Sequence, residues 1–295
     1  MNCVRRAGTI ALLASLPMLG QELKIDHVTA AGRDVRAMML ALHTVGIPSQ
    51  YGGPHANHAT EMALASFPDG SYLELIAIQR RADPAALAAH EWHVAMESYA
   101  GPCAWAVRPA DLPAEIQRLR AASVAVTDPK RNARLRPDRV RLDWETAQVG
   151  AGNGTFFPFL IRDFTPRDDR AYPTGKPTTE SYAGVSKVVI GVQDLDGAVA
   201  KFQHAYGLRA PERQTDAVFG AALAWFRGTP VVLATPLSSG SWLDVRLHRF
   251  GDGPCAFILM HGKKSGISIK RGSDWFGKQV AWFDPGQLGW YLGVE

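Results

Sequence analysis

The stretch Asp69-Gly70-Ser71-Tyr72-Leu73-Glu74-Leu75-Ile76 places a carboxylate in the middle of an apolar run. Asp-Gly favours a turn because glycine adopts positive φ at no steric cost. The aromatic and apolar residues that follow predict a strand over 71–78. Side chains alternate along a strand, so Tyr72, Glu74 and Ile76 share one face. A buried carboxylate is costly unless it is paired, hydrogen-bonded or bound to a metal, and Glu74 therefore needs a partner.

The composition is that of an ordinary folded protein with room for about two domains in 295 residues. Apolar residues make up 46% of the chain and charged residues 20%, which argues against disorder. The net charge of +4 is modest, and the arginines are scattered apart from an expected basic loop at 130–141. Because no known nucleic-acid-binding motif is present, we expect no nucleic-acid partner.

The first 22 residues are left out of the fold prediction. Arg5-Arg6 precede an apolar run at 7–20, which is too short to span a bilayer and resembles the start of a secretory signal. No A-x-A cleavage site follows, so two interpretations stay open: residues 1–22 are a leader, or the start is set too early and Met18 is the initiator. The three cysteines form no CxxC pair, which favours a reducing compartment. We therefore expect a cytoplasmic protein, with export as the alternative.

The elements around the opening stretch follow the order βαβββ. Residues 24–31 predict a strand, and Asp34 lies at the N-cap of a helix with apolar residues at helical spacing. Gly46 ends that helix. Strands follow at 47–51, 61–67 and 71–78, with a loop at 54–58 between the first two of them.

The same order recurs three more times, and the last copy is truncated. The second unit predicts strands at 103–107, 124–126, 140–144 and 155–161, and the third at 185–192, 221–226 and 231–235. Helices begin at Asp111 and Asp194, and the fourth unit keeps strands at 255–260, 281–283 and 290–294. The near-copies Gly101-Pro102-Cys103-Ala104-Trp105 and Gly253-Pro254-Cys255-Ala256-Phe257 open the second and fourth units. We therefore expect paired units: a domain at 23–165, a linker at 166–183 and a second, degenerate domain at 184–295.

Four stretches resemble the vicinal oxygen chelate superfamily, and residues 23–165 are similar to a glyoxalase-like domain. They are Ile25-Asp26-His27-Val28, Gly52-Gly53-Pro54-His55, the opening stretch at 69–76, and Phe156-Phe157-Pro158-Phe159-Leu160-Ile161. The resemblance implies an α+β fold in which tandem βαβββ units pair into cupped mixed sheets, here two pairs. It leaves the reaction open, because the superfamily includes isomerases, dioxygenases, resistance enzymes and metal-free binding proteins.

The resemblance also implies metal ligands on the first and last strand of each unit. The matching positions of the first unit are His27 and Glu74, whose imidazole and carboxylate suit Zn, Mn, Fe, Ni or Co. The matching register gives Ala104 and Pro158 in the second unit, and Lys187 and Val232 in the third, none of which is a normal ligand.

A third ligand would have to come from His55 or His58 on the nearby loop. Three alternatives remain open for His27 and Glu74: a divalent metal site completed by one of these histidines, a buried histidine–glutamate hydrogen bond, or a metal-free acid/base pair. In the last case Glu74 is the base and His27 its partner.

Aromatic residues near the expected strands are candidates for an apolar ligand pocket. They are Tyr72, Trp105, Trp144, Phe157 and Phe159, and Arg141 is the candidate to hold an anionic substrate. We expect a small, partly apolar organic ligand and a homodimer. The functional alternatives are a lyase, isomerase or dioxygenase of the glyoxalase-like type, a non-catalytic binding or sequestering protein, and a structural partner protein.

Overall fold

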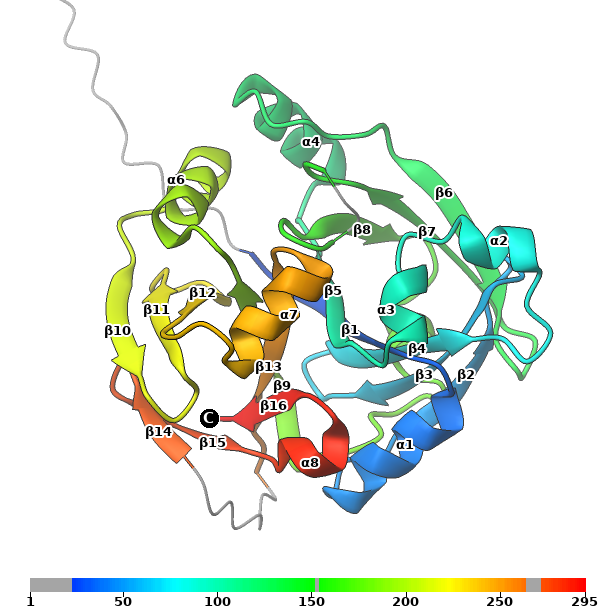
Figure 1. The fold of residues 1–295 in the computed structure, drawn as a ribbon. Coiled ribbons are helices and arrows are strands. Elements are labelled where there is room, and N and C mark those ends of the chain that lie inside the picture. The colour runs from blue at the N-terminus through cyan, green and yellow to red at the C-terminus, as the bar shows by residue number, and fades with distance from the viewer. Residues whose placement is uncertain (1–22, 152–153, 264–271) are drawn as a thin grey trace, which may run out of the picture.

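The structure, a computed structural model, describes residues 23–151, 154–263 and 272–295. These residues form two mixed sheets of eight strands each, with helices packed around them. Figure 1 shows the first sheet and its helices, in blue to green, beside the second sheet and its helices, in yellow to red. The predicted α+β fold of tandem βαβββ units is therefore confirmed. The leader or early start expected at 1–22 lies outside the described residues.

The first unit has the predicted element order. It consists of β1 (Ile25–Gly32), α1 (Val35–Thr44), β2 (Gln50–Pro54), β3 (Thr60–Ser66) and β4 (Tyr72–Ile78). Asp34 caps α1, because its carboxylate accepts hydrogen bonds from two backbone N–H groups of the first turn. Gly70 has φ +81°, so the turn before β4 uses the conformation that glycine permits.

The second unit follows two short helices, α2 (Pro84–Ala88) and α3 (His93–Glu97), and contains β5 (Gly101–Val107), α4 (Leu112–Ala121), β6 (Lys130–Leu135), β7 (Arg141–Ala147) and β8 (Phe159–Asp163). Three details correct the sequence prediction. Residues 130–135, expected in a basic loop, form β6; Val126 makes only an isolated bridge to Val149; and the strand expected from 155 begins at Phe159.

The second half of the chain begins with α5 (Arg167–Ala171), a helix inside the expected linker. The third unit contains β9 (Tyr182–Gly191), α6 (Leu195–Tyr206), β10 (Glu212–Asp216), β11 (Ala221–Trp225) and β12 (Val231–Pro236). After α7 (Trp242–Phe250), the fourth unit contains β13 (Gly253–His261), β14 (Gly272–Trp275), β15 (Lys278–Trp282), α8 (Pro285–Leu288) and β16 (Tyr291–Val294). Strands β10 and β14 were not predicted. Among the described residues of this last unit, α8 is the one helix, and it has four residues.

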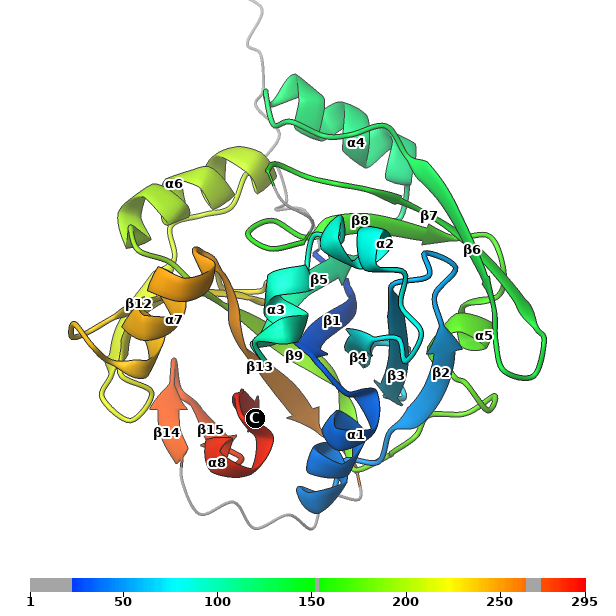
Figure 2. The same ribbon diagram turned by 45° about the vertical axis from the view of Figure 1, so that its right-hand side comes forward.

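Both sheets have the same strand order. The first runs β2-β3-β4-β1-β5-β8-β7-β6, and the second β10-β11-β12-β9-β13-β16-β15-β14. At the centre of the first sheet, β1 is parallel to β4 and antiparallel to β5, so the two units join there. Its edges approach each other, since Nη1 of Arg134 on β6 donates to the carbonyl of Gly52 on β2 at 2.7 Å. The sheet is therefore curved almost to closure, as Figure 2 shows from a second side, and its concave inner face is called the cup.

The outer faces of the two sheets share one apolar core. Val28 and Trp105 from the first sheet and Val188 and Phe257 from the second belong to the same buried cluster. This packing leaves the inner face of the first sheet free for a site. None of the helices in the described ranges has the length and apolar character needed to cross a membrane.

Candidate functional site

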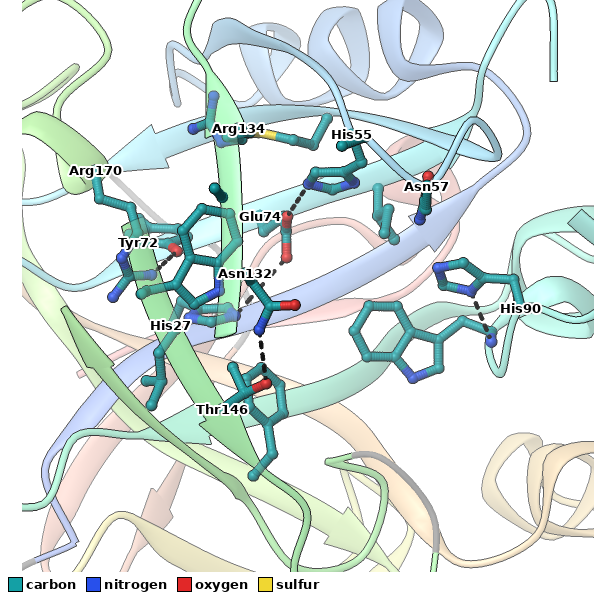
Figure 3. A pocket seen from close by; sticks show the side chains of 18 residues that line it. His27, His55, Asn57, Tyr72, Glu74, His90, Asn132, Arg134, Thr146 and Arg170 are labelled. Atoms are coloured by element: carbon teal, nitrogen blue, oxygen red, sulfur yellow. Dashed lines mark hydrogen bonds and ion pairs between the residues drawn. The ribbon is translucent and has the colours of Figure 1, made fainter. Parts of the chain in front are cut away.

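The cup of the first sheet contains a cavity of about 260 Å³. Its walls come from β1, β3, β4, β6, β7 and β8, from the loop after β2, from the connection between α2 and α3, and from α5. The apolar lining is Met62, Ile76, Trp92, Trp144, Phe159 and Ile161, and the polar side chains shown in Figure 3 face the same space.

Glu74 lies at the centre of the polar groups. In the sheet it pairs with Thr29 of β1, whose hydroxyl donates to Glu74 Oε2 at 3.2 Å. His27 Nε2 is 3.8 Å from the same oxygen, and His55 Nε2 is 3.6 Å from Oε1. Figure 3 shows the carboxylate between the two imidazoles. Two residues far apart in the sequence thus meet Glu74 inside the cup, on the face predicted by strand alternation.

His27 is fixed in orientation by its neighbours. Its Nδ1 lies 2.6 Å from Oδ1 of Asp26, and its ring stacks on Tyr72 with centroids 4.8 Å apart and 3° between the planes. Phe159 packs edge-on against the other side, with centroids 5.3 Å apart. Because an ionised carboxylate only accepts hydrogen bonds, Nδ1 carries the hydrogen that bonds Asp26, and Nε2 faces the cavity.

Asp26 is fully buried and held ionised by two arginines of α5. Arg170 Nη2 donates to both of its carboxylate oxygens at 2.8 and 3.0 Å, and Arg167 Nη1 donates to Oδ2 at 2.6 Å. Burial alone would raise the pKa of Asp26, but Arg170, Arg167 and His27 hold it well below its usual range. Arg170 also donates to the hydroxyl of Tyr72 at 2.6 Å, so α5 orients both rings of the stacked pair.

His55 reaches the cavity from the loop after β2. Its Nδ1 lies 2.8 Å from the hydroxyl of Thr60, and its main-chain carbonyl accepts from the side-chain amide of Gln79 at 2.9 Å. Burial lowers the pKa of His55, an effect that Glu74 opposes and Arg134 reinforces, so the ring is neutral at neutral pH.

The structure brings three of the five predicted aromatic residues to the cavity: Tyr72, Trp144 and Phe159. Trp105 was predicted to line the cavity, and the structure corrects this. Ala104 and Ala106 face the cup, so Trp105 between them points outward, because side chains alternate along a strand. It is buried in the shared core and donates to the carbonyl of Phe156.

Phe157 was also predicted to line the cavity, and it does not. It precedes β8, so strand alternation does not govern it, and it packs against Phe202 and Tyr206 of α6. Arg141 lies away from the cavity, 67% exposed, and pairs with Asp143. His58 is exposed, with φ +58°, and does not line the cavity, whereas His55 does.

Two charged residues of the cavity were missed by the sequence prediction. Arg170 comes from the stretch assigned to a linker, and Arg134 from the stretch assigned to a basic loop. The charge-rich run at 130–141 indicated only that these residues do not form a buried core strand. It gave no indication of which arginine faces inward.

The positions expected to hold a metal do not form a metal centre. Phe159 pairs with Ala106 as Glu74 pairs with Thr29, so the last-strand position of the second unit is Phe159 and not Pro158. Ala104 and Phe159 supply only carbon. The strand register thus leaves two of the four expected ligands missing.

A three-ligand alternative with His55 also fails to fit. Each imidazole faces a different oxygen of Glu74, and the nitrogen–oxygen distances of 3.6 and 3.8 Å are longer than the roughly 3.4 Å between neighbouring tetrahedral ligands bound at about 2.1 Å. In the part of the chain that the structure describes, no group of three or more histidine, cysteine, aspartate or glutamate residues could hold a metal ion.

In the second sheet, Lys187 and Val232 occupy the places of His27 and Glu74, because Val232 pairs with Val189 as Glu74 pairs with Thr29. Lys187 is buried and forms an ion pair with Glu295.

Comparisons with known proteins agree with this fold. A family model described as a glyoxalase-like domain matches residues 25–206. A hypothetical protein from Staphylococcus aureus has a similar structure, with 13% identity and a TM-score of 0.64, covering 92% of this chain and 98% of that chain. A 4-hydroxymandelate synthase variant from Streptomyces coelicolor is 11% identical with a TM-score of 0.58, covering 92% of both chains. These likenesses show the fold, and no curated protein matches by sequence.

Proposed function

Since this chain belongs to the glyoxalase-like domain family of the vicinal oxygen chelate superfamily, we propose that it is an enzyme that moves a proton on a small, partly apolar organic molecule bound in the cup of the first sheet. The observation that carries this proposal is the position of Glu74: a carboxylate between two imidazoles in a largely apolar cavity.

Glu74 serves as the base in this proposal. It lines the cavity, so a substrate atom can approach its oxygens, as a general base requires. The Thr29 hydroxyl donates to Oε2 and fixes the carboxylate, while Oε1 faces His55 without a hydrogen bond of ordinary length. A carboxylate held in this way can take a proton from a carbon or hydroxyl group of the ligand.

His27 is the second proton-transfer group. Asp26 accepts the hydrogen of Nδ1, and Nε2 lies 3.8 Å from Glu74. The proton that Glu74 takes from one substrate atom can be returned by the protonated carboxyl group to a neighbouring atom, while Nε2 of His27 accepts a hydrogen bond or a proton from a hydroxyl group of the ligand. Such a pair suits an isomerisation or an elimination, in which one site is deprotonated and a neighbouring one is protonated.

The apolar walls support this chemistry. Trp144, Phe159 and Ile161 exclude water from one side of the polar groups, which strengthens the electrostatic interactions inside the cup. The same surfaces give the carbon part of a ligand its contact area.

The test is exchange of carbon-bound hydrogen with solvent deuterium, followed by proton NMR on small 2-oxo acids, hydroxy ketones and their aldehyde analogues. Glu74→Gln keeps the size of the side chain and removes the base, so exchange should fall by about 10²- to 10⁴-fold. Glu61→Gln is the matched control, because Glu61 lies on the neighbouring strand and pairs with Tyr51 away from the cavity. Exchange by Glu74→Gln at the wild-type rate would contradict the proposal.

A further inference from the structure

Arg134 is a buried charge whose guanidinium forms no ion pair in the described ranges. It lines the cavity from β6, and only 8% of it is exposed. The hydrogen bond found for it runs from Nη1 to the carbonyl of Gly52. A guanidinium group has five N–H donors, so most of the donors of Arg134 remain for another hydrogen-bond acceptor.

The neighbouring arginines differ in this respect. Arg170 meets the carboxylates of Asp26 and Asp163, and Arg136, two residues along from Arg134, pairs with Asp138. A buried charge without a partner is costly, and burial lowers the pKa of Arg134, although Tyr72 and Glu74 partly oppose this. The described part of the fold holds an arginine there without supplying a carboxylate at ion-pair distance, which points to a carboxylate supplied by the ligand.

We propose that the ligand is a small organic acid and that its carboxylate binds Arg134 inside the cup. This inference rests on the proposed function, because it assigns the substrate class of the same cavity. A single guanidinium carries one positive charge and accepts a planar carboxylate side-on through two N–H groups. The negative charge of Glu74 nearby favours a monoanion over a dianionic phosphate, for which one arginine is too little.

Neutral polar groups line the same wall farther along β6 and β7. Asn132, two residues before Arg134 on β6, donates from Nδ2 to the hydroxyl oxygen of Thr146 at 3.0 Å. The Thr146 hydroxyl keeps its own hydrogen for a ligand oxygen. Both side chains line the cavity.

The placement also orients the ligand. Figure 3 shows Arg134 and His55 above Glu74, and His27 below it. With its carboxylate at Arg134, an acid lays its carbon chain along Trp144 and Phe159. The carbon next to the carboxylate, or the one after it, then lies against Glu74 and His27, where the proposed proton transfer takes place.

The experiment compares acids with their amides, which differ in charge and hardly in shape. Phenylacetate and phenylacetamide, and 4-methylpentanoate and 4-methylpentanamide, are titrated into the wild-type protein by isothermal calorimetry and ligand-observed NMR. The acids should bind about tenfold or more tightly than the amides. Arg134→Gln should abolish that preference, whereas Arg141→Gln, which changes an exposed arginine on the neighbouring strand, should leave it intact.

Arg134→Lys separates binding from a structural role. Lysine keeps the positive charge and loses the planar fork, so part of the acid preference should survive. If Arg134 served only to join the sheet edges through Gly52, both substitutions would weaken acid and amide equally. Three results would each overturn the proposal. They are this equal weakening, an unchanged acid preference in Arg134→Gln, and acids that bind to the wild type no better than amides.

Glu74→Gln distinguishes this inference from the proposed function. Removing the negative charge of Glu74 should leave the acids bound at least as tightly as before. If Glu74→Gln exchanges hydrogen normally while Arg134→Gln loses the acid preference, the base assignment is wrong and the anion subsite stands. If Glu74→Gln loses exchange while Arg134→Gln keeps the acid preference, the base assignment stands and the anion subsite is wrong.

Discussion

Asp26→Asn is the perturbation that tests how the site is held together. The side chain is fully buried and accepts hydrogen bonds from Arg167, Arg170 and His27. Asparagine has nearly the same shape and no charge. The change therefore leaves two buried guanidinium groups facing an amide, while the packing around them stays almost the same.

The expected loss of stability follows from the hydrogen bonds and ion pairs that each partner of residue 26 keeps in the variant. Removing one member of a buried ion pair costs roughly 3–5 kcal/mol. Arg170 still has Asp163, and the amide oxygen of asparagine still accepts one bond, so we expect about 3 kcal/mol, at the lower end of that range. Since ordinary proteins are stable by about 5–15 kcal/mol, the variant should fold and be clearly weakened.

The pH dependence gives an independent check. The pKa of Asp26 is held well below 3.8, its ordinary value, so the unfolded chain takes up this proton first on acidification. The stabilisation is complete above about pH 3.8 and is lost as the pH falls through the lower pKa of the folded state. The difference between wild type and Asp26→Asn should thus be full at pH 7 and shrink in acid.

Urea unfolding, followed by tryptophan fluorescence and circular dichroism, measures both the loss of stability and its dependence on pH. Asp143→Asn is the matched control, because Asp143 pairs with the exposed Arg141 and its loss should change the stability far less. A loss below about 1 kcal/mol for Asp26→Asn, with an unchanged denaturant slope, would refute the reasoning.

Further predictions concern acid stability, packing and metals. Burial lowers the pKa of His55 from 6.5, so the unfolded chain protonates first, and wild-type stability should start to fall below about pH 6.5. His55→Asn should reduce that fall in urea titrations, and the exposed change His43→Asn should not. Phe202→Ala, at the centre of an aromatic cluster, should cost about 3–5 kcal/mol by urea unfolding. Dialysis against EDTA should leave the melting temperature and hydrogen exchange unchanged, because His27 and His55 face different oxygens of Glu74; a rise in melting temperature on adding Zn²⁺ or Mn²⁺ would contradict this.

The parts of the fold and site that could be predicted are those encoded by local pattern. Asp34, Asp111 and Asp194 cap the helices where their spacing predicted them. Alternation along β4 put Tyr72, Glu74 and Ile76 on one face, and all three line the cavity. A polar residue in an apolar strand was enough to predict the carboxylate that lies among the polar groups of this cavity.

The parts that could not be predicted depend on contacts between distant segments. Asp26 and Arg170 are 144 positions apart and meet because α5 packs against the end of β1, which no local pattern encodes. Arg134 lies on an edge strand without apolar alternation, so its residue types resemble a loop. Phe157 was misplaced because it precedes β8, and alternation cannot be counted outside a strand.

The second sheet shows what fills a cup of this fold. Its inner face carries Val232 in the place of Glu74 and packs an aromatic cluster that includes Phe219, Trp275 and Trp282. Helix α7 lies on this face, with Leu243 buried in the same cluster. The cup of the second sheet is therefore occupied by its own side chains where the first holds polar groups.

The corresponding helix of the first sheet explains why that cup stays open. Helix α3 precedes β5 as α7 precedes β13, but it has five residues where α7 has nine. The shorter helix packs Met96 against the rim, and the connection before it adds Trp92 and His90 to the cavity wall. A helix that stops at the rim thus leaves an accessible cavity, lined by Glu74 on β4 and Arg134 on β6, where the second sheet has a packed core.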